Sequence, residues 1–125
     1  MIRDALFAAI GPLFDGRVYP IEFPQSPYAP IWPAARYTII SATPSAAICG
    51  DSGDAADYRV QIDVVAEQYD AMVAKAGEVR DAMAAFDPIA TLQTYIEDSD
   101  PDTVTWRTIL DYVIGYSTPA DASTP

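Results

Sequence analysis

The acidic run from Glu97 to Asp102 holds the residues best suited to chemistry, because Asp98, Asp100 and Asp102 place a carboxylate at every second position. Alternating carboxylates ligate Ca²⁺ in EF-hand loops, where a glycine at the sixth position and a glutamate at the twelfth complete the site. Neither residue follows at the required distance. We therefore interpret the run as a solvated hairpin turn whose charges protect a sheet edge, and we keep the three aspartates as a candidate interface loop.

The 18 acidic residues make a chance pair of carboxylates easy, so such a pair does not indicate catalysis, and the specific catalytic motifs are missing from the sequence. There is no histidine, which removes imidazole-based triads, dyads and zinc sites. The segment from Gly50 to Gly53 lacks the GxSxG spacing of a nucleophile elbow, and no phosphate-binding glycine motif occurs. The single cysteine, Cys49, has no partner for an internal disulfide. We expect no catalytic residue, no cofactor and no bound metal, and hence no enzyme.

The excess of acidic over basic residues excludes some classes of binding partner. The 125 residues include 7 basic and 18 acidic side chains, which gives a net charge of -11. Such a surface does not attract nucleic acid or an anionic membrane. The sequence has no signal-peptide pattern and no apolar run approaching the ~20 residues of a membrane helix. We expect a soluble protein made in the cytoplasm that binds neither membrane nor specific DNA.

Hydrophobic periodicity predicts the elements that position these residues. A first amphipathic helix ends near Asp15, and a short extended piece at 17–19 precedes a proline-rich segment. Further strands are expected at 34–42, 58–64, 89–96 and 104–116, with a second helix at 70–85 and Asp70 as its N-cap. The fold class is α+β, an antiparallel or mixed sheet with two amphipathic helices packed on one face, in the order α-β-β-β-α-β-β. We expect one domain at 1–117 and a flexible C-terminal tail at 118–125.

Several segments, taken in order, resemble the minor tail proteins of long-tailed bacteriophages and phage-like particles, which are called tail terminator, tail completion or tail-to-head joining proteins. The resemblance covers residues 1–117 and follows the N-terminal helix. The segments that carry it are Gly16-Arg17-Val18-Tyr19-Pro20, Pro24-Gln25, Pro27-Tyr28-Ala29-Pro30, the strand from Arg59 to Ala66 and the helix from Tyr69 to Met83. Similar proteins often end the last strand with an aromatic and basic cluster, whereas 111–116 contains no basic residue.

The resemblance implies a structural virion protein. It implies a homohexameric ring on the end of the tail tube that stops tube polymerisation and joins the tail to the head or neck. The implied partners are other copies of the chain, the tail tube protein and a neck or head-completion protein. The implied location is the head-proximal end of the virion tail, with assembly in the bacterial host cytoplasm. DNA would pass through the channel without specific binding.

Six copies would carry a summed charge of -66 (6 × -11). An acidic lumen repels DNA and lets it slide, and we place Asp98, Asp100 and Asp102 as candidates for lining that lumen. Two other functions stay open. One is a neck or head-completion protein, which shares the ring arrangement, and the other is a small non-viral protein-binding domain.

Overall fold

The computed structural model describes residues 2–21, 31–44, 55–86, 89–101 and 104–117. The chain alternates between helices and strands in the predicted order α-β-β-β-α-β-β, with a short 3₁₀ turn after the first helix. The helices are α1 (Ile2–Ile10) and α2 (Tyr69–Ala84), and the turn is η1 (Gly11–Phe14). The strands are β1 (Val18–Pro20), β2 (Ala34–Pro44), β3 (Ala55–Ala66), β4 (Ala90–Asp100) and β5 (Thr105–Ser117).

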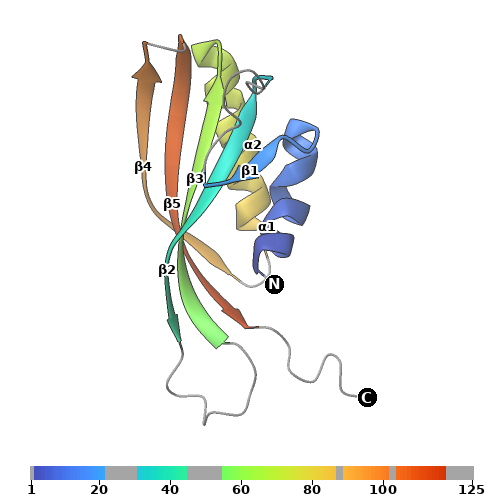
Figure 1. The fold of residues 1–125 in the computed structure, drawn as a ribbon, viewed down its shortest axis with the longest axis vertical. Coiled ribbons are helices and arrows are strands. Elements are labelled where there is room, and N and C mark those ends of the chain that lie inside the picture. The colour runs from blue at the N-terminus through green and yellow to red at the C-terminus, as the bar shows by residue number, and fades with distance from the viewer. Residues whose placement is uncertain (1, 22–30, 45–54, 87–88, 102–103, 118–125) are drawn as a thin grey trace.

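The strands form one five-stranded sheet in the order β1-β2-β3-β5-β4. Strand β1 pairs in parallel with β2, and every other neighbouring pair is antiparallel, so the sheet is mixed. Both helices lie on the same face of the sheet, and the far ends of β2, β3 and β5 extend beyond them (Figure 1). The α+β class is confirmed, and among the described residues one face of the sheet has no helix.

The alternation of apolar and polar residues along the central strands explains why both helices pack on one face of the sheet. In β3, Val60, Ile62 and Val64 point to one side and are fully buried. Their direct partners in β5 include Leu110 and Tyr112, which are buried as well. The helices complete the core with Ile2, Leu6, Ile10, Val79 and Met83. One face of both strands therefore lies in the core.

The two helices differ from the prediction at their ends. Helix α1 stops at Ile10, and the chain continues as 3₁₀ turn to Phe14 because Pro12 has no amide hydrogen for an α-helical bond. Helix α2 begins at Tyr69 after Gln68, whose side chain makes no cap hydrogen bond. The prediction that Asp70 is the N-cap is wrong. Asp70 lies in the first turn, where its charge complements the helix dipole.

The acidic segment also differs from its predicted form. Strand β4 continues to Asp100, with Asp98 opposite Arg107 and Asp100 opposite Thr105. These two aspartates therefore belong to a paired strand and not to a hairpin turn, and the physical reason at Asp98 is its basic cross-strand partner. Asp102 and the predicted tail at 118–125 lie outside the described residues. The predicted domain boundary at residue 117 stays a prediction.

Candidate interaction face

The face of the sheet opposite the helices, called here the helix-free face, carries a regular pattern of ion pairs. Each antiparallel strand pair contributes one arginine–aspartate pair that crosses between its two strands. The pairs are Arg36–Asp63 between β2 and β3, Arg59–Asp111 between β3 and β5, and Arg107–Asp98 between β5 and β4. Opposite charges on neighbouring strands favour one register of the sheet.

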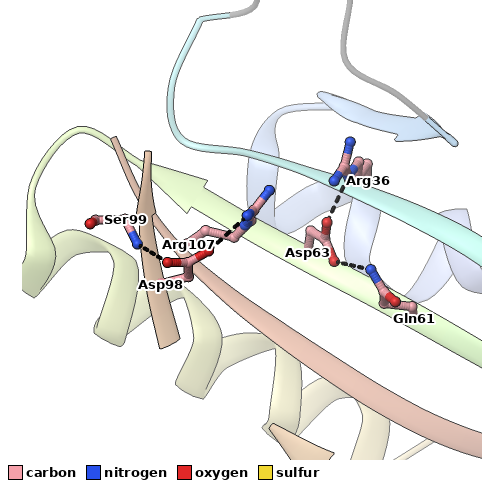
Figure 2. A network of polar contacts seen from close by, with 6 residues as sticks. All are labelled: Arg36, Gln61, Asp63, Asp98, Ser99 and Arg107. Carbon is pink, nitrogen blue, oxygen red and sulfur yellow. Dashed lines mark hydrogen bonds and ion pairs between the residues drawn. The ribbon is translucent and has the colours of Figure 1, made fainter. Parts of the chain in front are cut away.

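The Arg36–Asp63 pair is the most buried of the three. Arg36 Nε donates to Asp63 Oδ2 at 2.7 Å, and Gln61 Nε2 donates to the other carboxylate oxygen at 3.0 Å (Figure 2). The Asp63 side chain is 1% exposed, whereas that of Arg36 is 26% exposed. A carboxylate this buried is stable only with its charge and both oxygens satisfied, which these two donors provide.

The Arg59–Asp111 pair is more open to solvent. Arg59 Nη2 lies 2.7 Å from Asp111 Oδ2, and Arg59 Nε donates to Asp111 Oδ1 at 3.3 Å. Hydrogen bonding to Asp111, followed by the charge of Asp111, raises the pKa of Arg59 above its ordinary value. This bidentate pair joins two residues that are diagonal neighbours on adjacent strands.

The Arg107–Asp98 pair lies towards the β4 edge (Figure 2). Arg107 Nη2 donates to Asp98 Oδ2 at 3.0 Å, and the backbone N–H of Ser99 donates to Asp98 Oδ1 at 2.8 Å. The Ser99 hydrogen bond and then the Arg107 hydrogen bond hold the pKa of Asp98 below its ordinary value. Arg107 Nε is buried and has no hydrogen-bond partner.

On the helix face, the β4 side of the molecule carries an exposed aromatic corner, formed by Tyr69, Tyr95 and Trp106. The Tyr69 and Trp106 rings meet edge to face with centroids 5.3 Å apart. The hydroxyl of Tyr69 donates to Glu97 Oε1 at 2.9 Å, which raises the pKa of Tyr69. The Arg80 guanidinium lies 5.3 Å from the centre of the Tyr95 ring. Aromatic residues with a neighbouring arginine are typical of protein interfaces.

The structure brings two of the three candidate acidic residues onto one face. Asp98 and Asp100 are both on the helix-free side of β4, because they are separated by one residue in a strand. The sequence analysis did not identify the Arg36–Asp63–Gln61 group. The sequence does not distinguish Asp63 from the other polar residues of this strand, Asp57, Arg59 and Gln61, and its arginine partner is 27 residues away in sequence.

Metal binding and membrane insertion find no support in the part of the chain that the structure describes. None of its groups of acidic side chains is arranged to hold a metal ion. None of its helices combines the length and the apolar character needed to cross a membrane. What the described surface offers is charged strands and exposed aromatic side chains, which suit contacts with other proteins.

Comparisons with known proteins show where this fold occurs. A chain from the "Virion of native gene transfer agent (GTA) particle" has a similar structure, with a TM-score of 0.62 and 16% sequence identity. The similarity covers 94% of this chain and 95% of that chain. At this identity the likeness concerns the fold alone. No curated protein matches the sequence.

A family model identifies the class of protein to which this α+β domain belongs. The model described as "Tail completion protein gp17" matches residues 2–117, from the first residue of α1 to the last residue of β5. The chain belongs to this family of tail completion proteins. It is a structural component of a virion tail, and its family is not a family of enzymes. The resemblance found in the sequence is confirmed.

Proposed function

We propose that the chain forms a homohexameric ring on the head-proximal end of the tail tube, stops tube polymerisation there and joins the tail to the neck or head. The observation that carries this proposal is the family match over residues 2–117. The likeness in fold to a chain of a gene transfer agent virion supports it. The partners are further copies of the chain, the tail tube protein and a neck or head-completion protein, and assembly takes place in the host cytoplasm.

The charge of the helix-free face suits it to line the channel of such a ring. Among its described residues the acidic side chains are Asp57, Asp63, Asp98, Asp100 and Asp111, and the basic ones are Arg36, Arg59 and Arg107. The face is therefore acidic by two charges (5 − 3), and its three arginines are held in ion pairs. Arginines that already pair with carboxylates offer DNA phosphates little attraction, so DNA passes without specific binding.

Tube length in vitro tests the proposed function directly. Purified tail tube protein from the same particle is allowed to polymerise with and without this chain, and tube lengths are measured by electron microscopy. Termination predicts that tubes stop growing as the chain is added and that each stopped tube carries extra density at one end. Tubes that grow to the same lengths in both reactions would contradict termination.

The same reactions separate the alternatives. A neck or head-completion protein leaves tube length unchanged and binds the capsid-side components instead. A general protein-binding domain ignores both the tube and the capsid. Bovine serum albumin at the same protein concentration and a comparable acidic charge controls for non-specific effects on polymerisation.

A further inference from the structure

The sheet leaves two long stretches of backbone without a neighbouring strand among the described residues. Strand β4 is the last strand on one side, and the first part of its outer edge, 90–96, is open. On the opposite side β1 covers only residues 35–37 of β2, and the rest of β2, 38–44, has an open outer edge. Figure 1 shows the far end of β2 extending beyond the helices. Open edges expose unpaired N–H and C=O groups that can pair with another strand.

Both open stretches are uncharged in a chain with a net charge of -11. The segment 38–44 reads TIISATP, and the first part of β4, 90–96, reads ATLQTYI. Soluble proteins usually protect edges of this length with charged residues. Here large apolar side chains are exposed along them instead, with Ile40 at 50%, Tyr95 at 51% and Ile96 at 57%. The charges of β4 are confined to its other end, 97–100.

The directions of the two strands match for pairing between copies. Strand β2 is antiparallel to β3, β3 to β5, and β5 to β4, so β2 and β4 run in opposite directions. All copies in a ring have the same orientation relative to its axis. If that axis runs along the strands, β2 of one copy lies beside β4 of the next. The two strands would then be antiparallel, which is the stronger type of pairing.

The alternation of side chains between the two faces of the sheet also matches in the two open stretches. Each open stretch contains one β-bulge, at Ile40 in β2 and at Gln93 in β4. A bulge adds one residue to its strand and shifts the alternation of side chains by one, so two bulged strands keep one-to-one pairing where their bulges lie opposite each other. When 38–44 overlaps 90–96 completely and antiparallel, the two bulges lie almost opposite each other. Opposite residues of the two strands then point to the same face of the sheet on both sides of the bulges.

This overlap produces complementary side-chain pairs. Ile39 and Tyr95 meet on the helix face, as do Ala42 and Leu92. On the helix-free face Thr38 meets Ile96, and Thr43 meets Thr91. Pairs of β-branched, aromatic and threonine side chains are the combinations that stabilise neighbouring strands, and no like charges oppose each other.

We propose that the subunits of the ring join by pairing the open edge of β2 in one copy with the open edge of β4 in the next copy. The partner is a second copy of this chain, because one chain supplies both halves of the seam with matching length, direction and bulge position. A contact between two different patches is heterologous, and repeating it forms a ring when the rotation between neighbouring copies closes. The inference rests on the proposed ring and names the seam that holds it together.

Thiol cross-linking tests the seam. In a Cys49→Ser background, Ser41→Cys and Gln93→Cys are introduced singly and together, since the proposed overlap places these two exposed residues opposite each other. A short bismaleimide then links thiols that are close. The seam predicts a ladder of covalent products up to the hexamer for the double variant and no link for either single variant. The control pairs Gln93→Cys with Ala74→Cys, which is exposed on α2 and is expected to give no ladder.

The mass of the native particle, measured alone and on the tail tube, separates failure of the seam from failure of the ring. A hexamer in which the double variant does not cross-link would overturn the seam and leave the ring intact. A link in Gln93→Cys alone would show a symmetric β4–β4 dimer and would also overturn the seam. A chain that never assembles, alone or with tube protein, would contradict the ring and the seam together.

A charge placed on the edge gives a second readout. Ile40→Lys would bring an ammonium group into the seam, and we expect the hexamer fraction to fall about ten-fold or more. Ala74→Lys adds the same charge on the exposed side of α2 and should leave the hexamer fraction unchanged. Circular dichroism of both variants checks that the subunit stays folded. Equal hexamer fractions in the two variants would overturn the proposal.

Discussion

Asp63 lies on β3, the central strand of the sheet, and its contacts determine how much it stabilises the fold. Its only described donors are Arg36 and Gln61, and its side chain is almost completely buried. A buried charge that loses its partner is destabilising, because the partner left behind stays desolvated. The Arg36–Asp63 pair therefore fixes the register of β2 against β3 at a point where an error would be costly.

Asp63→Ala tests this role. We expect the free energy of unfolding to fall by about 2 kcal/mol, because Gln61 and the partly exposed Arg36 lose their acceptor. Urea denaturation followed by circular dichroism measures the change. Asp111→Ala is the matched control, since it removes an aspartate from an arginine on the same face whose side chain is 57% exposed. That change should cost less than about 1 kcal/mol, and equal losses in the two variants would contradict our account of Asp63.

The titration of Asp98 follows from its two donors. Because they hold the pKa of the folded carboxyl below its ordinary value of 3.8, Asp98 stabilises the fold above that pH. The stabilisation is lost as the pH falls through the pKa of the folded state. Carboxyl NMR should therefore show Asp98 titrating below 3.8.

Arg107→Gln separates the two donors of Asp98. The pKa of Asp98 should rise in this variant but stay below its ordinary value, because the Ser99 amide is the larger cause of the shift. A midpoint at or above the ordinary value in the native chain would contradict the geometry around Asp98. A complete return to the ordinary value in the variant would show that Ser99 contributes little.

At the scale of elements, helix α2 stabilises the sheet through one buried stripe. Val79 on this stripe is fully buried, whereas Val73 on the same helix is 42% exposed. Val79→Ala should lower the free energy of unfolding by about 2 kcal/mol, because it removes buried methyl groups and leaves a cavity. Val73→Ala is the matched control and should change it by less than about 0.5 kcal/mol. Comparable losses in thermal or urea denaturation would show that α2 does not pack as described.

The elements differ in how far the sequence predicts them. Strand β3 and the buried face of β5 follow from alternation, because their apolar residues recur at every second position. The continuation of β4 to Asp100 could not be predicted, since acidic residues favour turns unless a basic partner faces them across the strands. That partner, Arg107, is identified only by the register of β4 against β5. The N-terminus of α2 was misplaced because Asp70 has the chemistry of a cap but lies inside the first turn.

The candidate site shows the same limit. The sequence identified Asp98 and Asp100 as alternating carboxylates but assigned them to a hairpin turn, whereas strand β4 places them on one face of the sheet. It could not identify the Arg36–Asp63 or Arg59–Asp111 pairs, because their members lie 27 and 52 residues apart. Contacts between distant residues depend on strand order, and the order β3-β5-β4 places β5 between two strands that precede it in the chain.

For the whole molecule, the net charge of -11 sets how assembly responds to salt. Copies that carry this charge repel one another, and the proposed seam is uncharged, so added salt removes repulsion without weakening attraction. We expect the hexamer fraction to rise as the NaCl concentration increases from about 0.01 M to about 0.15 M. Sedimentation velocity measures the fraction at each concentration. A hexamer that dissociates over this range would show that ion pairs, and not strand pairing, hold the subunits together.

The most direct test of the central claim is the solution mass of the chain, measured by light scattering after size exclusion across a concentration series, with and without purified tail tube protein. The account predicts a particle of six chains, formed either by the chain alone or only when tube is added. A chain that stays monomeric and separate from the tube under both conditions would contradict a ring that ends the tail tube.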